Sequence, residues 1–421
     1  MQPPFLLPDA LARDIAARFG TPAYVYSQAA LEQQAAEALA FPVAYGLTVR
    51  FAMKALPNAS ILRLLDRLGL HFDASSGFEA TRAILAGIAP GKISLSTQEF
   101  PVDFARLQQA GIAVNACSLA QLDAIGRLFP GTPVGVRFNP GKGSGGTGKT
   151  NVGGPDASFG IWHEYATEVR KCAEKHGLKI TRIHTHIGSG SDPLIWQQTS
   201  HLSLALARLF PDVDTLNLGG GYKVARVSSE KGTDLQRVGA PVREAFEEIA
   251  RETGRKLRLE IEPGTFLVAN CGVLLARAQD ITDTGAGGRH FLKLDTGMTE
   301  LLRPSLYGAQ HPVTLIPSKP GISGPQRDYV VVGHCCESGD LVSCASGKPE
   351  IIATHRFPEA HIGDLCQIGG AGAYCASMSA KNYNSFPEAP EILLLSNNTP
   401  QLIRRRQTLA QIMQNEIRAA D

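Results

Sequence analysis

Several short stretches of the sequence carry residues whose combined chemistry points to one cofactor. Lys54 closes the apolar run RFAMK, three glycines (Gly219, Gly220 and Gly221) end the run NLGGG, and Glu262 lies in EIEPG. A lysine amine can form a Schiff base, and glycines let backbone N–H groups approach a phosphate closely. A carboxylate can keep a pyridine nitrogen protonated. Pyridoxal phosphate needs these three parts, so the sequence predicts a site for it.

Each stretch taken singly has a simpler interpretation. A lysine at a strand end is more often a surface residue whose stem packs on apolar atoms, and a triple glycine can be a tight turn. His184 and His186 in HTHIGSG face one side of a strand, but no third metal ligand follows at helical spacing. We therefore expect His186 to stack on a flat cofactor ring, Ser189 to add a hydroxyl to the phosphate site, and no metal.

The elements that must position these residues alternate between β-type runs and amphipathic helical windows, beginning near residue 47. This alternation is typical of a parallel sheet with crossover helices. The β-type runs are TVRFAMK, LHFDASS, KISLST, IAVNACS, PVGVRFNP, KITRIHTHIGS, VDTLNLGGG and LRLEIEPG. Eight such units predict a (β/α)8 TIM-type barrel, with an open doubly wound sheet as the main alternative.

Polar side chains gather at the C-terminal ends of these runs, which is where barrel enzymes form their active sites. The strand interiors are mostly apolar. The residues at the ends are Lys54, Asp73, Ser75, Arg137, Asn139, His184, His186, Ser189, Gly219, Gly220, Gly221 and Glu262. The convergence predicts one active site at one rim of the barrel.

The pattern of predicted elements changes after Gly264, where β-rich segments follow one another with few helical windows. We expect a barrel domain over residues 27–268 and a mainly antiparallel β domain over residues 269–421. Residues 1–26 are expected to pack on the second domain.

Composition narrows the class of protein. The 421 residues are 43% hydrophobic and carry a formal net charge of +2, with both signs scattered. The sequence shows no basic stripe for nucleic acid and no membrane-length apolar run, and we expect no signal peptide. Eight cysteines without a CxxC pair favour reduced thiols in the cytoplasm.

The joint pattern resembles the fold-type III pyridoxal-phosphate decarboxylases, and within them the diaminopimelate decarboxylases of bacterial lysine synthesis. The resemblance covers nearly the whole chain. It is carried by FAMKA, HTHIGSG, NLGGG, EPG, LRPSLYGAQHP, CESGD, GAYCASMSAKNYNS and LIRRRQT. It implies decarboxylation of meso-2,6-diaminopimelate to L-lysine and carbon dioxide by a homodimer with shared active sites.

The resemblance also implies roles for single residues. Lys54 would bind the cofactor aldehyde and Glu262 the ring nitrogen, while Cys336 of the neighbouring subunit would protonate the substrate carbon. The implied cofactor-binding residues are Lys54, Asp73, His186, Ser189, Gly219, Gly220, Gly221, Glu262, Gly264 and Tyr374. The implied substrate-binding residues are Arg303, Tyr307, Glu337 and Tyr374.

Two positions depart from the family pattern. Thr265 follows EPG where the family usually has an arginine, and Phe386 follows NYNS where an arginine is common. A threonine hydroxyl can donate one hydrogen bond, but it cannot bind a carboxylate through two charged hydrogen bonds as an arginine guanidinium can. Either groups such as Arg303 bind the substrate carboxylate, or the enzyme acts on another basic amino acid: ornithine, arginine or a carboxylated polyamine. A racemase and a non-catalytic regulator are further alternatives, which CESGD and Lys54 respectively disfavour.

Overall fold

The computed structural model describes residues 3–146, 148–189, 192–319 and 324–419. Residues 1–2, 147, 190–191, 320–323 and 420–421 of the predicted domains lie outside these ranges. The chain divides into two compact units. Unit 1 comprises residues 32–224 and 231–267, and unit 2 comprises the residues up to Leu31, residues 225–230 and the residues from Val268 onward. The predicted boundaries at residues 27 and 268 stay predictions.

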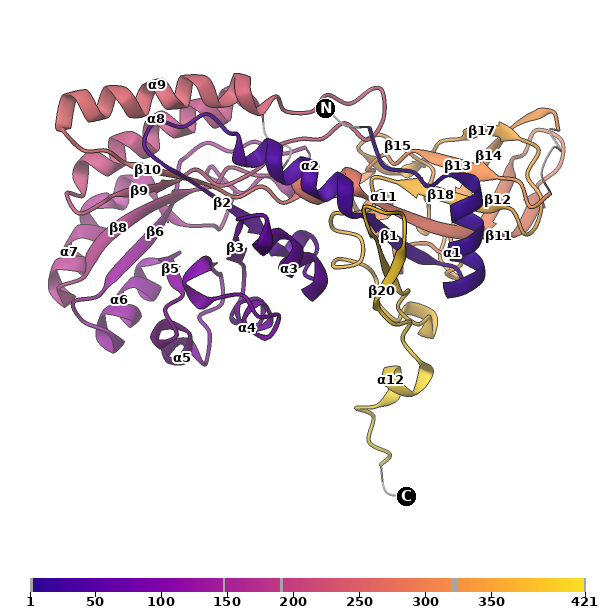
Figure 1. Ribbon diagram of the computed structural model, residues 1–421, viewed down its shortest axis with the longest axis horizontal. Helices are drawn as coiled ribbons and strands as arrows, with labels where there is room; N and C mark the ends of the chain where they lie inside the picture. The colour runs from indigo at the N-terminus through magenta and orange to yellow at the C-terminus, as the bar shows by residue number, and fades with distance from the viewer. Residues whose placement is uncertain (1–2, 147, 190–191, 320–323, 420–421) are drawn as a thin grey trace. The chain divides into compact units, whose positions relative to one another are not determined.

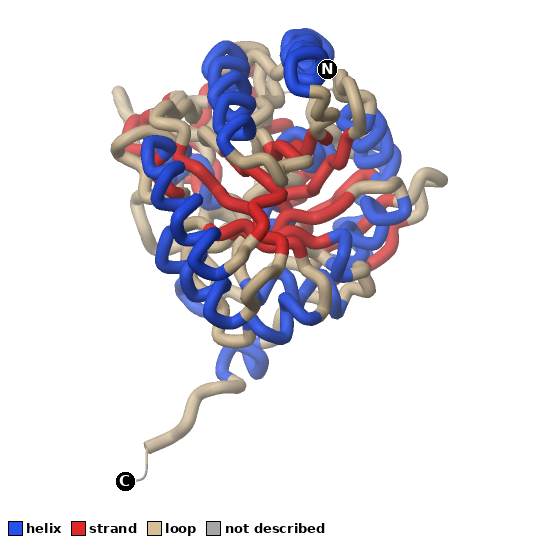
Figure 2. Tube along the Cα trace, turned by 90° about the vertical axis from the view of Figure 1, so that its left-hand side faces the viewer, coloured by secondary structure: helices blue, strands red, loops and turns tan. Residues whose placement is uncertain are grey.

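Unit 1 is built on a closed parallel sheet of eight strands, with the two-residue strand β7 paired at the edge of β6 (Figures 1 and 2). Figure 2 shows the strands enclosed by helices. The barrel strands are β2 (Leu47–Ala52), β3 (His71–Ala74), β4 (Ile93–Ser96), β5 (Ala113–Ala116), β6 (Pro133–Asn139), β8 (Lys179–Thr185), β9 (Thr215–Asn217) and β10 (Arg258–Ile261), and β7 is Ile161–Trp162. The predicted TIM-type barrel is confirmed.

The crossover helices carry the apolar stripes that the sequence showed. In α3, Ile61, Leu62 and Leu65 are fully buried, and the Asn58 side chain accepts the Ser60 N–H to start the helix. The helices of this region are α2 (Gln28–Leu39), α3 (Ala59–Arg67), α4 (Gly77–Leu85), α5 (Phe104–Gln109), α6 (Leu119–Leu128), α7 (Ala166–His176), α8 (Pro193–Leu209), α9 (Leu235–Thr253) and α10 (Thr265–Val268). Short 3-10 turns are η1 (Met53–Ala55), η2 (Pro90–Lys92), η3 (Gly148–Thr150) and η4 (His163–Tyr165).

Unit 2 is a mixed, mostly antiparallel sheet, in agreement with the predicted β domain. Its strand order is β17-β14-β12-β11-β1-β19-β20, with β18 pairing both β11 and β13, and a separate β15-β16 pair. The strands are β1 (Ala23–Ser27), β11 (Gly272–Asp283), β12 (His290–Leu294), β13 (Val313–Ile316), β14 (Gln326–Val332), β15 (Cys344–Ala345), β16 (Lys348–Ile352), β17 (His355–Pro358), β18 (Leu365–Gly369), β19 (Glu391–Leu394) and β20 (Pro400–Arg404). Its helices are α1 (Asp9–Phe19), α11 (Leu302–Tyr307) and α12 (Leu409–Met413), with turns η5 (Ala269–Cys271) and η6 (Tyr383–Ser385).

The N-terminal segment is part of the unit 2 core. Strand β1 lies between β11 and β19, and Ile15 of α1 packs in one apolar cluster with Val273, Ile316 and Ile392. The side chain of Gln367 exchanges two hydrogen bonds with the backbone of Leu7. The first residues of the chain therefore complete a sheet whose other strands come almost 250 residues later.

No helix in the described ranges is long and apolar enough to cross a membrane.

Candidate active site

The ends of β2, β3 and β10 meet at one rim of the barrel. Lys54 lies in η1 directly after β2 and is exposed to solvent. The Ala52 N–H donates to the carbonyl of Pro263, which follows β10, and Ala52 pairs in register with Asp73 on β3. The strand register therefore brings Lys54, Asp73 and Glu262 to the same rim, as the sequence predicted for a single site.

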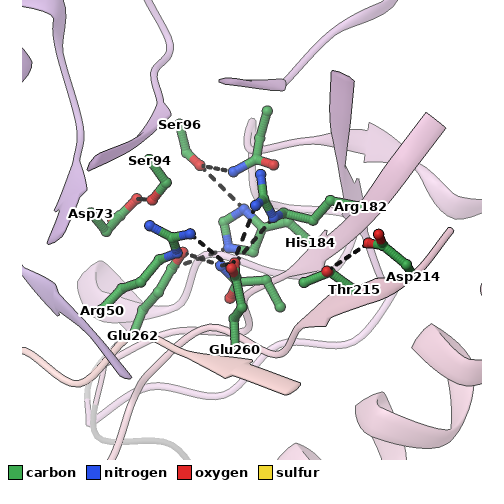
Figure 3. Close-up of polar contacts among 12 residues, drawn as sticks. Arg50, Asp73, Ser94, Ser96, Arg182, His184, Asp214, Thr215, Glu260 and Glu262 are labelled. Carbon is green, nitrogen blue, oxygen red and sulfur yellow. Dashed lines mark hydrogen bonds and ion pairs between the residues drawn. The ribbon is translucent and has the colours of Figure 1, made fainter. Parts of the chain in front are cut away.

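Glu262 is the best-positioned carboxylate of this rim, and Figure 3 shows the polar network in which it lies. Its side chain is 6% exposed. Asn217 Nδ2 donates to Glu262 Oε1 over 2.6 Å, and His184 Nε2 lies 3.2 Å from Glu262 Oε2. Burial opposes ionisation, but His184 and the hydrogen bond from Asn217 outweigh it and hold the pKa of Glu262 well below its usual range. Glu262 is therefore a fixed negative charge at neutral pH.

His184 is held in one orientation by its two neighbours. Burial lowers the pKa of His184 below its ordinary value, so its ring is neutral at pH 7. The Ser96 hydroxyl lies 3.3 Å from Nδ1, and Nε2 lies 3.2 Å from Glu262 Oε2. His184 thus orients the carboxylate, a role that the sequence did not assign to it.

Asp73 has the opposite electrostatic character. It is 4% exposed and accepts a hydrogen bond of 3.1 Å from the Ser94 hydroxyl. Burial and the charge of Glu262 raise the pKa of Asp73 well above its ordinary value, although nearby Lys54 opposes the rise. The rim therefore combines one ionised carboxylate with one whose ionisation is disfavoured.

The triple glycine forms a turn that only small residues allow. Gly219 has φ +65° and Gly221 has φ +106°. A Cβ on Gly219 would lie 2.6 Å from His186 Nδ1, and a Cβ on Gly220 would lie 2.1 Å from the Glu262 carbonyl oxygen. The close approach of these backbones explains why glycine stands here.

The same turn orients His186. The Gly220 N–H donates to His186 Nδ1 over 3.2 Å, and the Gly219 N–H donates to Asn217 Oδ1 over 2.9 Å. Desolvation, Arg137 and Lys54 hold the pKa of His186 well below its ordinary value, so its ring is neutral. A neutral imidazole with a fixed plane suits stacking on an aromatic ring. Of the three glycine N–H groups, that of Gly221 is the one without a partner in the described part of the chain.

Ser189 is held by the glycine-rich segment that follows β6. Its N–H donates to the Thr150 carbonyl over 2.9 Å, and its own carbonyl accepts the Gly146 N–H over 2.8 Å. Asn139, at the end of β6, holds this segment through the backbone of Gly154. The glycine-rich segment therefore supports the backbone that follows β8.

Gly264 follows β10 in unit 1, and the predicted residues not yet described lie in unit 2. Arg303 and Tyr307 are on α11, where the Tyr307 hydroxyl contacts the sulfur of Met378 at 3.9 Å. Cys336 is exposed, and its N–H donates to Asn384 Oδ1 over 3.0 Å. Tyr374 has φ +55°, a backbone conformation that non-glycine residues rarely adopt.

Glu337 lines a pocket of about 620 Å³ within unit 2. The pocket has an apolar wall from α11 and polar groups from the segments around Glu337 and Asn382. Its lining residues are Met298, Leu302, Ser305, Leu306, Glu337, Gly339, Ala380, Lys381, Asn382 and Tyr383. Phe386, which stands where an arginine was expected, stacks on His334 with ring centroids 3.6 Å apart.

Asp123, Cys172 and His176 on α6 and α7 form a group whose ligand atoms lie close enough together to hold a metal. Asp123 Oδ1 is already 2.8 Å from both Lys175 Nζ and His176 Nε2. Hydrogen bonds from Lys175 and His176 hold the pKa of Asp123 well below its usual range. The contacts are those of an ion-pair cluster.

Comparisons with known proteins identify the family. The family described as "Pyridoxal-dependent decarboxylase, pyridoxal binding domain" matches residues 29–269. The diaminopimelate decarboxylase of Streptomyces coelicolor is 36% identical over 414 residues, which are 96% of this chain and 90% of that protein. The chain belongs to the pyridoxal-dependent decarboxylases. The predicted family is confirmed, and pyridoxal phosphate is its cofactor.

Solved structures agree with this assignment. A crystal structure of diaminopimelate decarboxylase aligns with a TM-score of 0.87 at 35% identity, covering 96% of this chain and 95% of that one. A second, the Helicobacter pylori diaminopimelate decarboxylase complexed with L-lysine, aligns with a TM-score of 0.82 at 27% identity and covers 96% and 98%.

The residues at the rim fit pyridoxal phosphate. Lys54 is an exposed residue at the rim, Glu262 supplies an ionised carboxylate, and the Gly219–Gly221 turn packs so closely on His186 and Glu262 that it leaves no room for a Cβ on Gly219 or Gly220. The sequence did not indicate two supporting roles. Asn217 and His184 both act on Glu262 from the ends of neighbouring strands, and for Asn217 its place just before the glycines was the available signal.

Proposed function

We propose that the protein decarboxylates meso-2,6-diaminopimelate to L-lysine and carbon dioxide, with pyridoxal phosphate as cofactor. The observation that carries the proposal is the pairing of an exposed Lys54 with a buried, ionised Glu262 at one barrel rim. Its support in the comparisons is the similarity to diaminopimelate decarboxylases over nearly the whole chain.

Bound pyridoxal phosphate supplies an electron-withdrawing ring that stabilises the electron pair left on the substrate carbon when carbon dioxide departs. In this proposal Lys54 holds the cofactor through its aldehyde, and Glu262 keeps the ring nitrogen protonated. His186 covers the face of the ring. The phosphate is bound by Ser189, Gly219–Gly221, Gly264 and Tyr374, while Asp73 supports the lysine.

The substrate is held by unit 2 in this proposal. Arg303 and Tyr307 bind its far end, with Glu337 and Tyr374 beside it. Cys336 of the partner subunit donates a proton to the carbon that lost carbon dioxide, which balances the reaction. This arrangement requires a homodimer in which each subunit completes the other's site, and we place the enzyme in the cytoplasm. The Helicobacter pylori relative complexed with L-lysine supports binding of a small amino acid.

Thr265 favours a second candidate function. It lies at the start of α10 and offers a hydroxyl where the resemblance implies an arginine. A decarboxylase of ornithine, arginine or a carboxylated polyamine would need fewer cationic groups for the substrate.

A substrate panel separates these functions. Purified protein supplied with pyridoxal phosphate is assayed for carbon dioxide release from meso-diaminopimelate, L-ornithine, L-arginine and carboxyspermidine. The proposal expects meso-diaminopimelate to have the highest kcat/KM, with L-lysine as product. A higher kcat/KM for any other compound would replace the proposed substrate.

A further inference from the structure

A cavity of about 300 Å³ lies within unit 1 and is lined by none of the residues predicted to bind the cofactor or the substrate. Its walls come from the chain directly after β6, from the junction of β7 and η4, and from α8. The lining residues are Pro140, Gly141, Lys142, Trp162, His163, Gln198, Thr199 and Leu202. The volume is at the lower end of the range for small-molecule pockets, so the cavity suits a compact ligand.

The wall after β6 is held in place by Asn139. The Gly141 N–H donates to Asn139 Oδ1 over 3.1 Å, and the same oxygen accepts the Gly154 N–H over 2.9 Å. Gly141 has φ +70°, and a Cβ on it would lie 2.7 Å from His163 Nε2 and 3.4 Å from Cη2 of Trp162. Glycine at 141 therefore permits this turn and lets the backbone approach both rings closely.

Two flat side chains form the wall at the junction of β7 and η4. The rings of Trp162 and His163 have centroids 5.0 Å apart and planes at 38°, and both residues are half-buried. The hydroxyl of Thr199 on the α8 wall is already used, because it donates to the Ile195 carbonyl over 2.9 Å. Faces of this kind favour a ligand with a flat, apolar body that can pack on the rings.

The charge of the lining is positive. Lys142 Nζ donates to Gln198 Oε1 over 3.2 Å, so its ammonium group is paired with a neutral amide. Within the part of the chain that the structure describes, Lys142 forms no ion pair, and none of the lining residues is acidic. An indole ring can attract a cation, but the ammonium group of Lys142 would repel one. Because Gln198 accepts through Oε1, its amide N–H groups remain available as donors beside the lysine. An anion is therefore the favoured ligand.

We propose that this cavity binds a small molecule with one anionic group, a carboxylate or a phosphate, on a flat apolar body. Lys142 and Gln198 bind the anionic group through charge-assisted and neutral hydrogen bonds. Trp162 and His163 pack on the flat body. The inference goes beyond the proposed function and does not depend on it, because the cavity and the barrel rim are formed by different residues.

The test titrates the holoenzyme with four probes and follows binding by ligand-observed NMR. Benzoate and phenyl phosphate have a flat ring and a negative charge, benzamide has the ring without the charge, and cyclohexanecarboxylate has the charge without the flat ring. Benzoate or phenyl phosphate should bind with a dissociation constant of about 1 mM or lower, as expected for a ligand of this size. Benzamide and cyclohexanecarboxylate should each bind about 3- to 10-fold more weakly. The tighter of the two aromatic anions identifies the anionic group.

Each of two variants should remove one of these preferences. Lys142→Met should weaken benzoate binding about 3- to 10-fold and abolish the preference for benzoate over benzamide. Trp162→Leu should abolish the preference for benzoate over cyclohexanecarboxylate and keep the preference over benzamide. Lys149→Met is the matched control, since Lys149 lies in η3 of the same glycine-rich segment but does not line the cavity. Its affinities should equal those of the unaltered enzyme.

Three results would overturn the inference. One is that neither benzoate nor phenyl phosphate binds the unaltered holoenzyme, and another is that benzamide binds as tightly as benzoate. The third is an unchanged benzoate affinity in Lys142→Met, which would place the bound anion elsewhere on the protein. If Trp162→Leu does not fold, the comparison of Lys142→Met with Lys149→Met carries the test, because both lysine side chains are exposed.

Discussion

Glu260 and Glu262 are two buried glutamates close together in the sequence. We predict that replacing Glu262 lowers kcat, whereas replacing Glu260 lowers the stability of the fold. Glu260 is 4% exposed and pairs with Arg50 at 2.7 Å and Arg182 at 3.1 Å (Figure 3). Glu262 is 6% exposed, and among the described residues its polar side-chain partners are Asn217 and His184, with no arginine or lysine paired to it. The charge of Glu260 is therefore already matched within the barrel, whereas we propose that the charge of Glu262 serves the cofactor ring.

The magnitudes follow from these contacts. Glu262→Gln keeps an acceptor for Asn217 but removes the charge. Two unit charges about 3 Å apart attract by roughly 5 kcal/mol at an effective dielectric constant of about 20. If about 3–4 kcal/mol of that attraction is lost from the barrier for carbon dioxide loss, kcat falls roughly 100- to 1,000-fold. Glu260→Gln instead leaves two buried arginines without their carboxylate and should cost about 3–5 kcal/mol of stability.

The assay measures kcat at saturating substrate and thermal unfolding for both variants, with cofactor content checked by visible absorbance. Glu262→Gln should lose kcat with little change in unfolding temperature. Glu260→Gln should unfold at a lower temperature and keep kcat within a few-fold for the folded enzyme. The reasoning would be refuted if Glu262→Gln kept kcat within threefold of the unaltered enzyme at full cofactor content. Equal losses of kcat in the two variants would refute it as well.

Two further predictions concern the cofactor cradle and the pH dependence of stability. Gly220→Ala places a Cβ 2.1 Å from the Glu262 carbonyl oxygen, so the affinity for pyridoxal phosphate should fall at least tenfold in a titration, whereas Gly91→Ala, in open space, should leave it unchanged. Burial raises the pKa of Glu300 to about 7, above its unfolded value, so its contribution favours folding below about pH 4.5 and is lost as the pH rises through about 7. Glu300→Gln should therefore stabilise the protein at pH 8 by about 3 kcal/mol relative to pH 4.5, and a gain of equal size at both pH values would contradict this interpretation.

The barrel could be predicted from the sequence because the patterns that indicate its strands and helices lie within short segments of the chain. Each strand is a short apolar run, each crossover helix carries its own apolar stripe, and a count of eight such units favoured a closed barrel over an open doubly wound sheet. The strand-end rule then placed Lys54, Asp73 and Glu262 at one rim before the register was known. Lys54 itself lies in a short turn just beyond β2, which propensity could not distinguish from the strand end.

The rest depended on long-range contacts. Strand β1 pairs with β11 and β19, and the residues of its run AYVYS do not indicate which strands it pairs with. Arg226 lies in a polar stretch that is typical of a solvated loop, yet it is 7% exposed and its Nε donates to the Gly370 carbonyl. Asn217 looked like an ordinary strand residue until the structure placed it 2.6 Å from Glu262.

The measurement that tests the central claim most directly is the formation of L-lysine from meso-diaminopimelate by the purified holoenzyme, with Lys54→Ala beside it. We predict that the unaltered enzyme releases carbon dioxide and L-lysine in equal amounts and that Lys54→Ala forms neither at a measurable rate. An unaltered enzyme that binds pyridoxal phosphate yet forms no L-lysine would contradict the proposed function. Equal rates for the two proteins would contradict the role of Lys54.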